Sequence, residues 1–323
     1  MQLNPDDKMD SKLAPIVLFV YNRPWHTRQT LEALSKNILA TQSTLYIFAD
    51  GPKENISETE VCQIKEVRQI IRLKKWCKEV HIIESDKNNG LANSVINGIN
   101  RVLNSHSSII VLEDDVIVSR GFLDYMNTAL TLYKDIDKVM TISGYNFPLP
   151  SIQRNNKAYF VPLSTTQAWA TWKRAWNFFD MSASGYDKLK TDDSLRKKFD
   201  LDNSFPYSDM LITQMESDKI SSWAIKWWWS VFKHKGIVLY PDKSLVYNIG
   251  WDGSGVHSGK HNPFETNDFD INYFISFFPD KITTHDEYFS KIKSYIYNSV
   301  TRKRTEKKEG NGLISKIVNK IFR

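Results

Sequence analysis

Residues 108–115 read SIIVLEDD, a short run rich in β-branched residues that leads directly into three carboxylates. Such a run predicts a buried strand, with the acidic residues placed where the strand ends. Three adjacent carboxylates repel one another unless a cation is near, and carboxylate oxygens are ligands that Mg²⁺ and Mn²⁺ prefer. Taken alone, such a triplet is more often a solvent-exposed loop with capping carboxylates. Its setting decides between the two interpretations.

Strand-like and helix-like segments alternate on the N-terminal side of this stretch. Apolar runs at 15–21, 44–49 and 80–84 are predicted strands, and the segments 24–37, 57–75 and 91–103 are predicted helices. The runs lack alternation of polar and apolar residues, which is typical of a parallel sheet covered on both faces. The sequence therefore predicts an α/β fold with a mostly parallel central sheet and helices on both faces.

Polar clusters follow three of the predicted strands. They are Asn-Arg at 22–23, Asp-Gly at 50–51 and the Glu-Asp-Asp of 113–115. Ligands of open α/β sheets bind beyond the carboxyl ends of the strands. We therefore expect the three clusters to converge on one edge, which favours a binding site over three unrelated loops.

The second half of the sequence is less regular. A helix at 122–134 and strands at 139–143 and 237–240 are predicted, and residues 249–260, with four glycines, are a predicted loop. The charged segment 182–208 is expected to be a mobile insertion.

Two segments are rich in tryptophan, 167–179 and 221–233, and both are predicted helices. Tryptophans three or four residues apart lie on one helical face. They suit the wall of an acceptor-sugar site or the protein core, and they are Trp169, Trp172, Trp223 and Trp227.

The positive charge lies at the C-terminal end. Residues 302–323 hold eight Lys and Arg against two Glu, so they carry the whole net charge of +6, and residues 1–301 are balanced. A nucleic-acid-binding protein would carry a basic stripe across its fold. We therefore expect no nucleic-acid partner.

Cysteine usage and the absence of targeting patterns in the sequence bear on the compartment. Cys62 and Cys77 lack metal-type spacing and are expected to be reduced thiols. Residues 1–12 are polar, which indicates no secretion signal, and no apolar run reaches the length of a membrane span. These features predict a cytoplasmic protein.

Residues 313–323 form an amphipathic pattern. Apolar residues at 313, 314, 317, 318, 321 and 322 share one helical face, and Lys316, Lys320 and Arg323 share another. A basic amphipathic helix is typical of segments that lie in an anionic membrane surface. Docking on the protein's own body or on a second subunit is the alternative. The pattern predicts a peripheral protein at the inner membrane.

A family resemblance rests on two segments. Residues 110–125 (IVLEDDVIVSRGFLDY) resemble the metal-binding strand and helix of GT-A-fold glycosyltransferases of the N-acetylglucosaminyltransferase I type, and residues 19–37 resemble their first strand and helix. The spread of matches from 15 to 257 is similar to bacterial sugar transferases that decorate surface polysaccharides. The resemblance implies a GT-A fold and an inverting transfer, dependent on Mn²⁺ or Mg²⁺, from a UDP-sugar donor to a saccharide or lipid-linked saccharide acceptor.

The expected organisation follows. Residues 14–265 would form the catalytic domain, with a nucleotide-binding half (14–115) and an acceptor half (116–265). Residues 266–300 would be a C-terminal helical extension, and residues 301–323 the basic amphipathic membrane-surface tail.

The resemblance implies roles for single residues. Asp115 would bind the metal, Asp114 the ribose hydroxyls, and Glu113 would face the donor sugar. Asp50 would accept from the uracil N3–H, and Arg23 would lie against the base or the diphosphate. A carboxylate suits an N–H donor and an arginine fork suits phosphate, whereas a turn-forming aspartate and a surface arginine are the structural alternatives.

Two loops complete the implied nucleotide site. Asn88, Asn89 and Gly90 occupy the turn that closes over the nucleotide in related enzymes. In the glycine-rich segment 250–259, His257 would be a further metal ligand or touch the diphosphate. An exposed loop histidine is the alternative.

The catalytic base is the weakest part of the resemblance. An inverting transferase needs a carboxylate that takes the proton of the acceptor hydroxyl. The matching helix here reads WAIKW at 223–227 and holds no acid. Asp252 is the first candidate and Asp209 the second, each with a solvent-exposed loop acid as the alternative.

Two other functions remain open at this point. A sugar-nucleotide nucleotidyltransferase would carry a glycine-rich loop after its first strand, where this chain has YNRP at 21–24. A non-catalytic carbohydrate-binding protein would explain the missing acid at 224. Release of UDP from UDP-sugars separates the three.

Overall fold

The computed structural model describes residues 13–149, 154–217, 222–253 and 269–306, with side chains described to residue 301. The N-terminal part consists of β1 (Ile16–Val20), α1 (Pro24–Ser35), η2 (Ala40–Gln42), β2 (Thr44–Ala49), α2 (Glu58–Ile70), β3 (Glu79–Glu84), α3 (Leu91–Leu103) and β4 (Ser108–Glu113). Then follow β5 (Val116–Val118), α4 (Phe122–Leu132), β6 (Val139–Ser143), β7 (Ala158–Val161), β8 (Trp169–Trp172) and α5 (Lys173–Trp176). The remainder consists of η3 (Tyr186–Lys190), α6 (Asp193–Phe199), α7 (Tyr207–Glu216), α8 (Trp223–Lys233), β9 (Ile237–Pro241), β10 (Val246–Asn248) and α9 (Asp286–Glu306).

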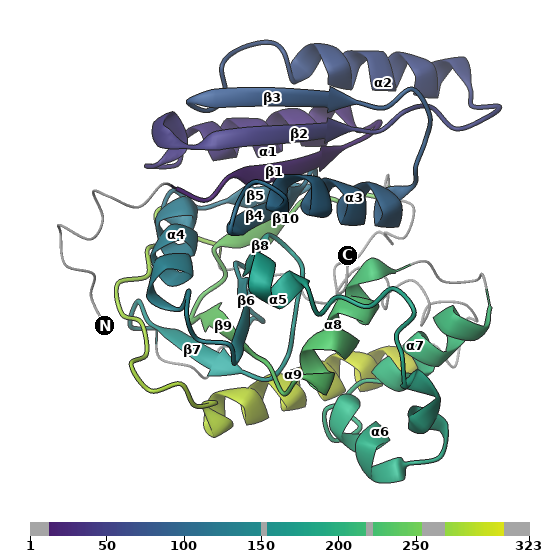
Figure 1. Ribbon diagram of the computed structural model, residues 1–323, viewed down its shortest axis with the longest axis vertical. Helices are drawn as coiled ribbons and strands as arrows, with labels where there is room; N and C mark the ends of the chain where they lie inside the picture. Colours follow the sequence, from purple (N-terminus) through teal and green to yellow (C-terminus); the bar gives the residue numbers. More distant parts are fainter. Residues whose placement is uncertain (1–12, 150–153, 218–221, 254–268, 307–323) are drawn as a thin grey trace.

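One eight-stranded sheet runs through the molecule in the order β3-β2-β1-β4-β8-β6-β9-β7 (Figure 1). The first four strands in this order pair in parallel, as do β6 and β9, whereas β8 and β7 pair antiparallel to their neighbours. The expected α/β class, with a mostly parallel central sheet and helices around it, is confirmed.

Local sequence explains where the N-terminal helices begin. Helix α1 starts at Pro24, whose missing N–H costs nothing in a first turn, and α2 starts with a capping box between Ser57 and Glu60. Gly90 precedes α3 with φ of +74°, a conformation that favours glycine. These starts place the polar loops after β1, β2 and β3 at the carboxyl edge of the sheet.

A short second sheet positions the segment that follows it. Strand β10 pairs antiparallel with β5, which directly follows the acidic residues of β4. The backbone N–H of Ile249 then donates to the carbonyl of Asp115 (2.9 Å). The start of the glycine-rich loop is thereby held beside Asp115.

The tryptophan-rich segment 167–179 is not one helix, so that prediction was wrong. Its first part is strand β8, which lies between β4 and β6, and only the single turn of α5 is helical. Pairing on both sides outweighs a weak helical pattern. In the segment 221–233, predicted to be helical, residues 223–233 form helix α8.

The four tryptophans named above are buried. Trp169 stacks on Trp223 with ring centroids 5.5 Å apart and lies 6.0 Å from Trp227. Trp172 donates its indole N–H to the carbonyl of Leu130 (3.1 Å). Packing between α8 and the sheet is therefore their main role, and of the four only Trp223 also lines the cleft described below.

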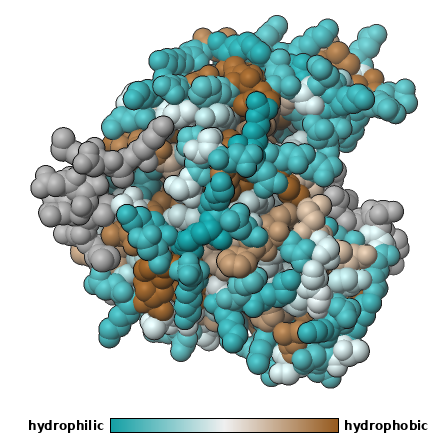
Figure 2. Space-filling model, in the orientation of Figure 1, coloured by the Kyte–Doolittle hydropathy of each residue, from teal (hydrophilic) through white to brown (hydrophobic). Residues whose placement is uncertain are grey.

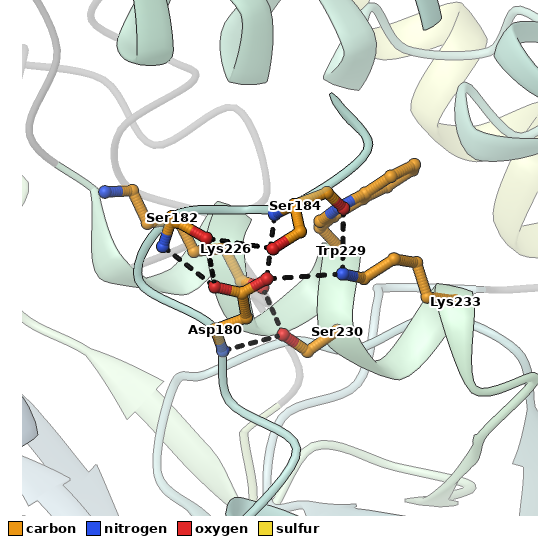
Figure 3. A network of polar contacts seen from close by, with 7 residues as sticks. All are labelled: Asp180, Ser182, Ser184, Lys226, Trp229, Ser230 and Lys233. Atoms are coloured by element: carbon orange, nitrogen blue, oxygen red, sulfur yellow. Dashed lines mark hydrogen bonds and ion pairs between the residues drawn. The ribbon is translucent and has the colours of Figure 1, made fainter. Parts of the chain in front are cut away.

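The segment expected to be a mobile insertion is folded, so that prediction was also wrong. It contains η3 and α6, and it fully buries Ala183, Leu189 and Phe199. Figure 3 shows how it is fixed to α8: Asp180 accepts hydrogen bonds from Ser182 and Ser184, and Lys233 reaches the same carboxylate. Its many charged residues form the outer surface, which is why composition alone suggested mobility.

Helix α9 lies along the lower edge of the molecule in Figure 1 and packs on β7. It buries Tyr288, Ile292 and Ile296, and it continues across the expected boundary at residue 301. None of the helices that the structure describes is long and apolar enough to cross a bilayer. The predicted membrane segment, 313–323, lies outside the described residues.

Candidate functional site

A cleft of about 560 Å³ opens at the carboxyl ends of β1, β2, β3 and β4. Ligand pockets commonly have volumes of about 300–1,000 Å³. In Figure 2 the outline of the molecule is indented on the right, between the upper part with β1–β3 and the lower part with α6–α8. All three polar clusters contribute lining residues, so the structure brings them together as the strand order requires.

The floor of the cleft is aromatic. Phe19 and Phe48 stack with ring centroids 5.4 Å apart and planes at 25°, and both line the cleft. Gly98 of α3 faces them, and a Cβ there would lie 2.6 Å from the Phe19 ring. A glycine in mid-helix costs about 0.5–1 kcal/mol relative to alanine, and close packing at this slot explains its presence. Phe19, Phe48 and Gly98 thus form an apolar part of the cleft lining, which is called the aromatic slot below.

Asp50 connects two loops at the polar side of the cleft. Its Oδ1 accepts from the backbone N–H groups of Gly51 and Asn89, each at 2.9 Å, and its Oδ2 accepts from the Ser94 hydroxyl at 3.3 Å. The side chain of Asn88 donates to the Gly51 carbonyl (2.9 Å). The carboxylate therefore fixes the 88–90 turn at the start of α3.

Arg23 links the two aspartates of the acidic cluster. Its Nε lies 3.3 Å from Asp114 Oδ2, its Nη2 contacts Asp114 Oδ1, and its Nη1 lies 3.1 Å from Asp115 Oδ2. The carboxylates are nearly inaccessible, with side-chain exposures of 6% and 3%. Burial alone would lower the pKa of the guanidinium, but the charges of both aspartates outweigh it and raise that pKa.

Asp115 is enclosed by the segment after β10. Asn248 Nδ2 lies 3.4 Å from Asp115 Oδ1. A Cβ on Gly250 would collide with Asp115 Oδ2 and lie 2.9 Å from its Cβ and Cγ. Only glycine fits at this position unless Asp115 moves.

Asp252, the first candidate base, lies beside the N-terminal turn of α1. Its Oδ2 is 3.1 Å from Nε2 of the buried His26, an ion pair whenever the histidine is protonated. His26 is three positions after Arg23 at the start of α1, and Asp252 is two positions after Gly250. Asp252 is thus close in the chain to a residue that contacts the acidic cluster, but it does not line the cleft, and 45% of its side chain is exposed.

The other predicted residues are placed as follows. Asp209 lies on α7, 62% exposed and paired with Arg196, and it does not line the cleft. His257 lies outside the described residues. Glu113 lines the cleft, and so do Asn88, Asn89 and Gly90.

The acidic cluster offers few protein ligands for a divalent cation. No group of three His, Cys, Asp or Glu side chains within the described ranges could hold a metal ion. Asp114 and Asp115 nevertheless present buried carboxylate oxygens, and they already hold one cationic group, the guanidinium of Arg23. Mg²⁺ sites commonly use one or two carboxylates plus substrate phosphates. The pair fits a cation of that kind if the remaining ligands come from a bound diphosphate.

Several site residues have no signal in the sequence. Phe19 and Phe48 are ordinary strand residues there, and Gly98 is an ordinary helix residue. His26 and Asn248 are single polar residues far apart in the chain. Only Gly250 belonged to a predicted loop, and its fit against Asp115 depends on the pairing of β5 with β10.

Comparison with known proteins finds only distant likeness. No protein-family model and no curated protein matches the chain. Among solved structures, it is similar to UDP-glucose pyrophosphorylase complexed with UDP-glucose (10% identity, 52% of this chain and 79% of that one, TM-score 0.28). It is also similar to an active-site mutant of LgtC (10%, 55% and 65%, 0.33) and to S. aureus TarS (11%, 72% and 60%, 0.36). The match spans less than two thirds of the LgtC and TarS chains, and TM-scores this low carry no inference about fold or activity.

Proposed function

We propose that this chain is a glycosyltransferase of the GT-A type that transfers a sugar from a UDP-sugar donor to a saccharide or lipid-linked saccharide in bacterial surface polysaccharide synthesis. One observation carries the proposal. An aromatic slot and a buried pair of aspartates bridged by an arginine lie in and beside one cleft, at the carboxyl edge of a parallel sheet. This arrangement suits a ligand with a planar base at one end and a diphosphate further along.

The base would lie in the slot beside Phe48, with its polar edge toward Asp50. Asp50 Oδ2 accepts only a 3.3 Å bond from Ser94 among the bonds the structure records. A carboxylate oxygen has more than one lone pair, so Oδ2 can accept the uracil N3–H as well. Asn89, held by Asp50, would set the wall of the same subsite.

A divalent ion, Mn²⁺ or Mg²⁺, would be held by Asp115 and Asp114. When bound, it would neutralise charge on the leaving diphosphate. Asp114 and Glu113 line the cleft, and we assign them to the ribose hydroxyls and the donor sugar. Arg23 supplies a cationic fork at the same place.

Asp252 is the proposed base. Its side chain is 45% exposed, which leaves it accessible to an acceptor, and its carboxylate lies 3.1 Å from His26 Nε2. It would take the proton of the acceptor hydroxyl as that oxygen attacks the anomeric carbon with inversion, while the UDP leaves. Ser222 and Trp223, which belong to the acceptor half, also line the cleft.

The test is UDP release from a panel of UDP-sugars with Mn²⁺. Asp115→Ala should abolish release because it removes a ligand group. Asp252→Ala should lose acceptor-dependent turnover, whereas Asp209→Ala serves as the exposed-acid control and should stay active. Full activity of Asp115→Ala in the presence of a chelator would contradict the proposal, and so would production of a sugar nucleotide from a sugar phosphate.

The place of action is a separate proposal. Residues 313–323 would anchor the protein peripherally at the cytoplasmic face of the inner membrane, since each basic residue near an anionic leaflet contributes about 1 kcal/mol. Flotation with anionic liposomes compares the full chain with a chain that ends at Thr301. The full chain should float at low salt and the shortened one should not. Equal behaviour of the two contradicts the proposal.

A further inference from the structure

Arg23 occupies the acidic cluster through its whole guanidinium. Three nitrogen atoms contact Asp114 and Asp115, and the arginine side chain is only 12% exposed. Both carboxylates belong to adjacent residues and point to one cation. Arg23 therefore already supplies the positive charge that two neighbouring buried carboxylates require.

A divalent ion would change the charge balance among these three groups. Two carboxylates and one guanidinium, taken by themselves, carry a net charge of −1. A divalent ion added beside Arg23 turns the same group to +1 and places like charges close together. A diphosphate, with its own negative charge, removes that repulsion.

Space around Asp115 makes the two cations compete. Asp115 Oδ2 faces Arg23 Nη1 at 3.1 Å, and Gly250 closes the other side of this oxygen without room for a Cβ. Asp115 Oδ1 faces the Asn248 amide at 3.4 Å. A cation that binds Oδ2 therefore comes close to the arginine nitrogen, and the repulsion between the two positive charges favours displacement of the arginine.

We propose that Arg23 is an internal counter-cation for Asp114 and Asp115, that it leaves Asp115 when a divalent ion binds, and that the diphosphate of the donor then receives it. The inference rests on the proposed function. It predicts that metal and nucleotide bind cooperatively, and that the metal alone binds weakly. Arg23 lines the cleft, so its guanidinium lies at the surface that a bound diphosphate would contact.

The test measures Mn²⁺ binding to the full chain by electron paramagnetic resonance of free Mn²⁺, with and without UDP. In the wild type, saturating UDP should tighten Mn²⁺ binding at least tenfold, which corresponds to about 1.4 kcal/mol. In Arg23→Gln, Mn²⁺ alone should bind at least tenfold more tightly than in the wild type, because the competing cation is gone. UDP should bind this variant more weakly, and the tightening by UDP should shrink.

Arg28→Gln is the matched control, since Arg28 is an exposed arginine of the same helix, and its Mn²⁺ affinity should equal that of the wild type. Arg23→Lys, which keeps a charge without the fork, should fall between wild type and Arg23→Gln. Unchanged or weaker Mn²⁺ binding by a folded Arg23→Gln overturns the inference and leaves the proposed function standing. If Arg23→Gln does not fold, the tightening by UDP in the wild type decides, and its absence overturns the inference. No Mn²⁺ or UDP binding by the wild type overturns both.

Discussion

Two roles are proposed for the Asp50 carboxylate: it stabilises the 88–90 turn, and it accepts a hydrogen bond from the uracil base. Its Oδ1 accepts two backbone N–H bonds at 2.9 Å, from Gly51 and Asn89, and its Oδ2 accepts from Ser94. Asp50→Ala removes these bonds and leaves the two backbone donors to water. Bonds to charged groups contribute about 1.5–3 kcal/mol each when buried, and these are partly exposed. We expect a total loss of about 2 kcal/mol, or about 4 °C in Tm.

Asp50→Asn separates the two roles. The amide oxygen can still accept both backbone bonds, and the amide NH₂ can donate to Ser94, so the loss of stability should stay below about 1 kcal/mol. An NH₂ group placed against the uracil N3–H cannot accept it. We therefore expect UDP to bind at least tenfold more weakly, about 1.4 kcal/mol.

Urea unfolding and calorimetry with UDP, GDP and CMP give both readouts. The wild type should bind UDP most tightly, and Asp50→Asn should lose that preference while remaining folded. If Asp50→Asn binds UDP like the wild type, Asp50 does not read the base. If Asp50→Ala has the same free energy of unfolding as the wild type, the hydrogen bonds that Asp50 accepts do not stabilise the 88–90 turn. GDP binding tighter than UDP binding would count against uracil altogether.

Three further predictions follow from single contacts. Gly250→Ala forces Asp115 to move, so we expect the free energy of unfolding to fall by about 1–3 kcal/mol from overpacking. Mn²⁺-linked UDP binding should weaken by about 10²-fold. UDP binding as tight as that of the wild type in calorimetry would refute the contact between Gly250 and Asp115. Burial would raise the pKa of Asp180, but hydrogen bonds from the neighbouring serines outweigh burial and lower that pKa (Figure 3). Asp180 therefore contributes to folding stability at pH values above its pKa in the unfolded chain, near 3.9, and this contribution is lost as the pH falls. The difference in free energy of unfolding between wild type and Asp180→Asn, about 1 kcal/mol at pH 7, should therefore narrow below about pH 4. The exposed Asp187→Asn control should show no such difference. Burial raises the pKa of the Cys77 thiol to about 12, so a thiol reagent should modify one cysteine in the folded chain and two in urea; two fast reactions without urea would contradict its burial.

The sequence determined the part of the fold that depends on local pattern. Alternating apolar runs and helical segments predicted β1 to β4 and α1 to α3, because a short β-rich run and a capped helix are recognisable without knowledge of their neighbours. The rule that ligands bind at the carboxyl ends of parallel strands then placed the three polar clusters together. Arg23, Asp50 and Asp114 do line one cleft.

Only the tertiary structure decided what those residues contact. Arg23 bonds to Asp114 across 91 positions, and Asp50 bonds to Asn89 across 39, and no local pattern encodes such pairs. The first part of segment 167–179 is a strand because β4 and β6 hydrogen-bond to it on both sides. Segment 182–208 is folded because its few apolar residues are buried in the core. Local propensities differ by less than about 1 kcal/mol per residue. Long-range pairing and burial exceed that difference, so they decide these segments and complete the site.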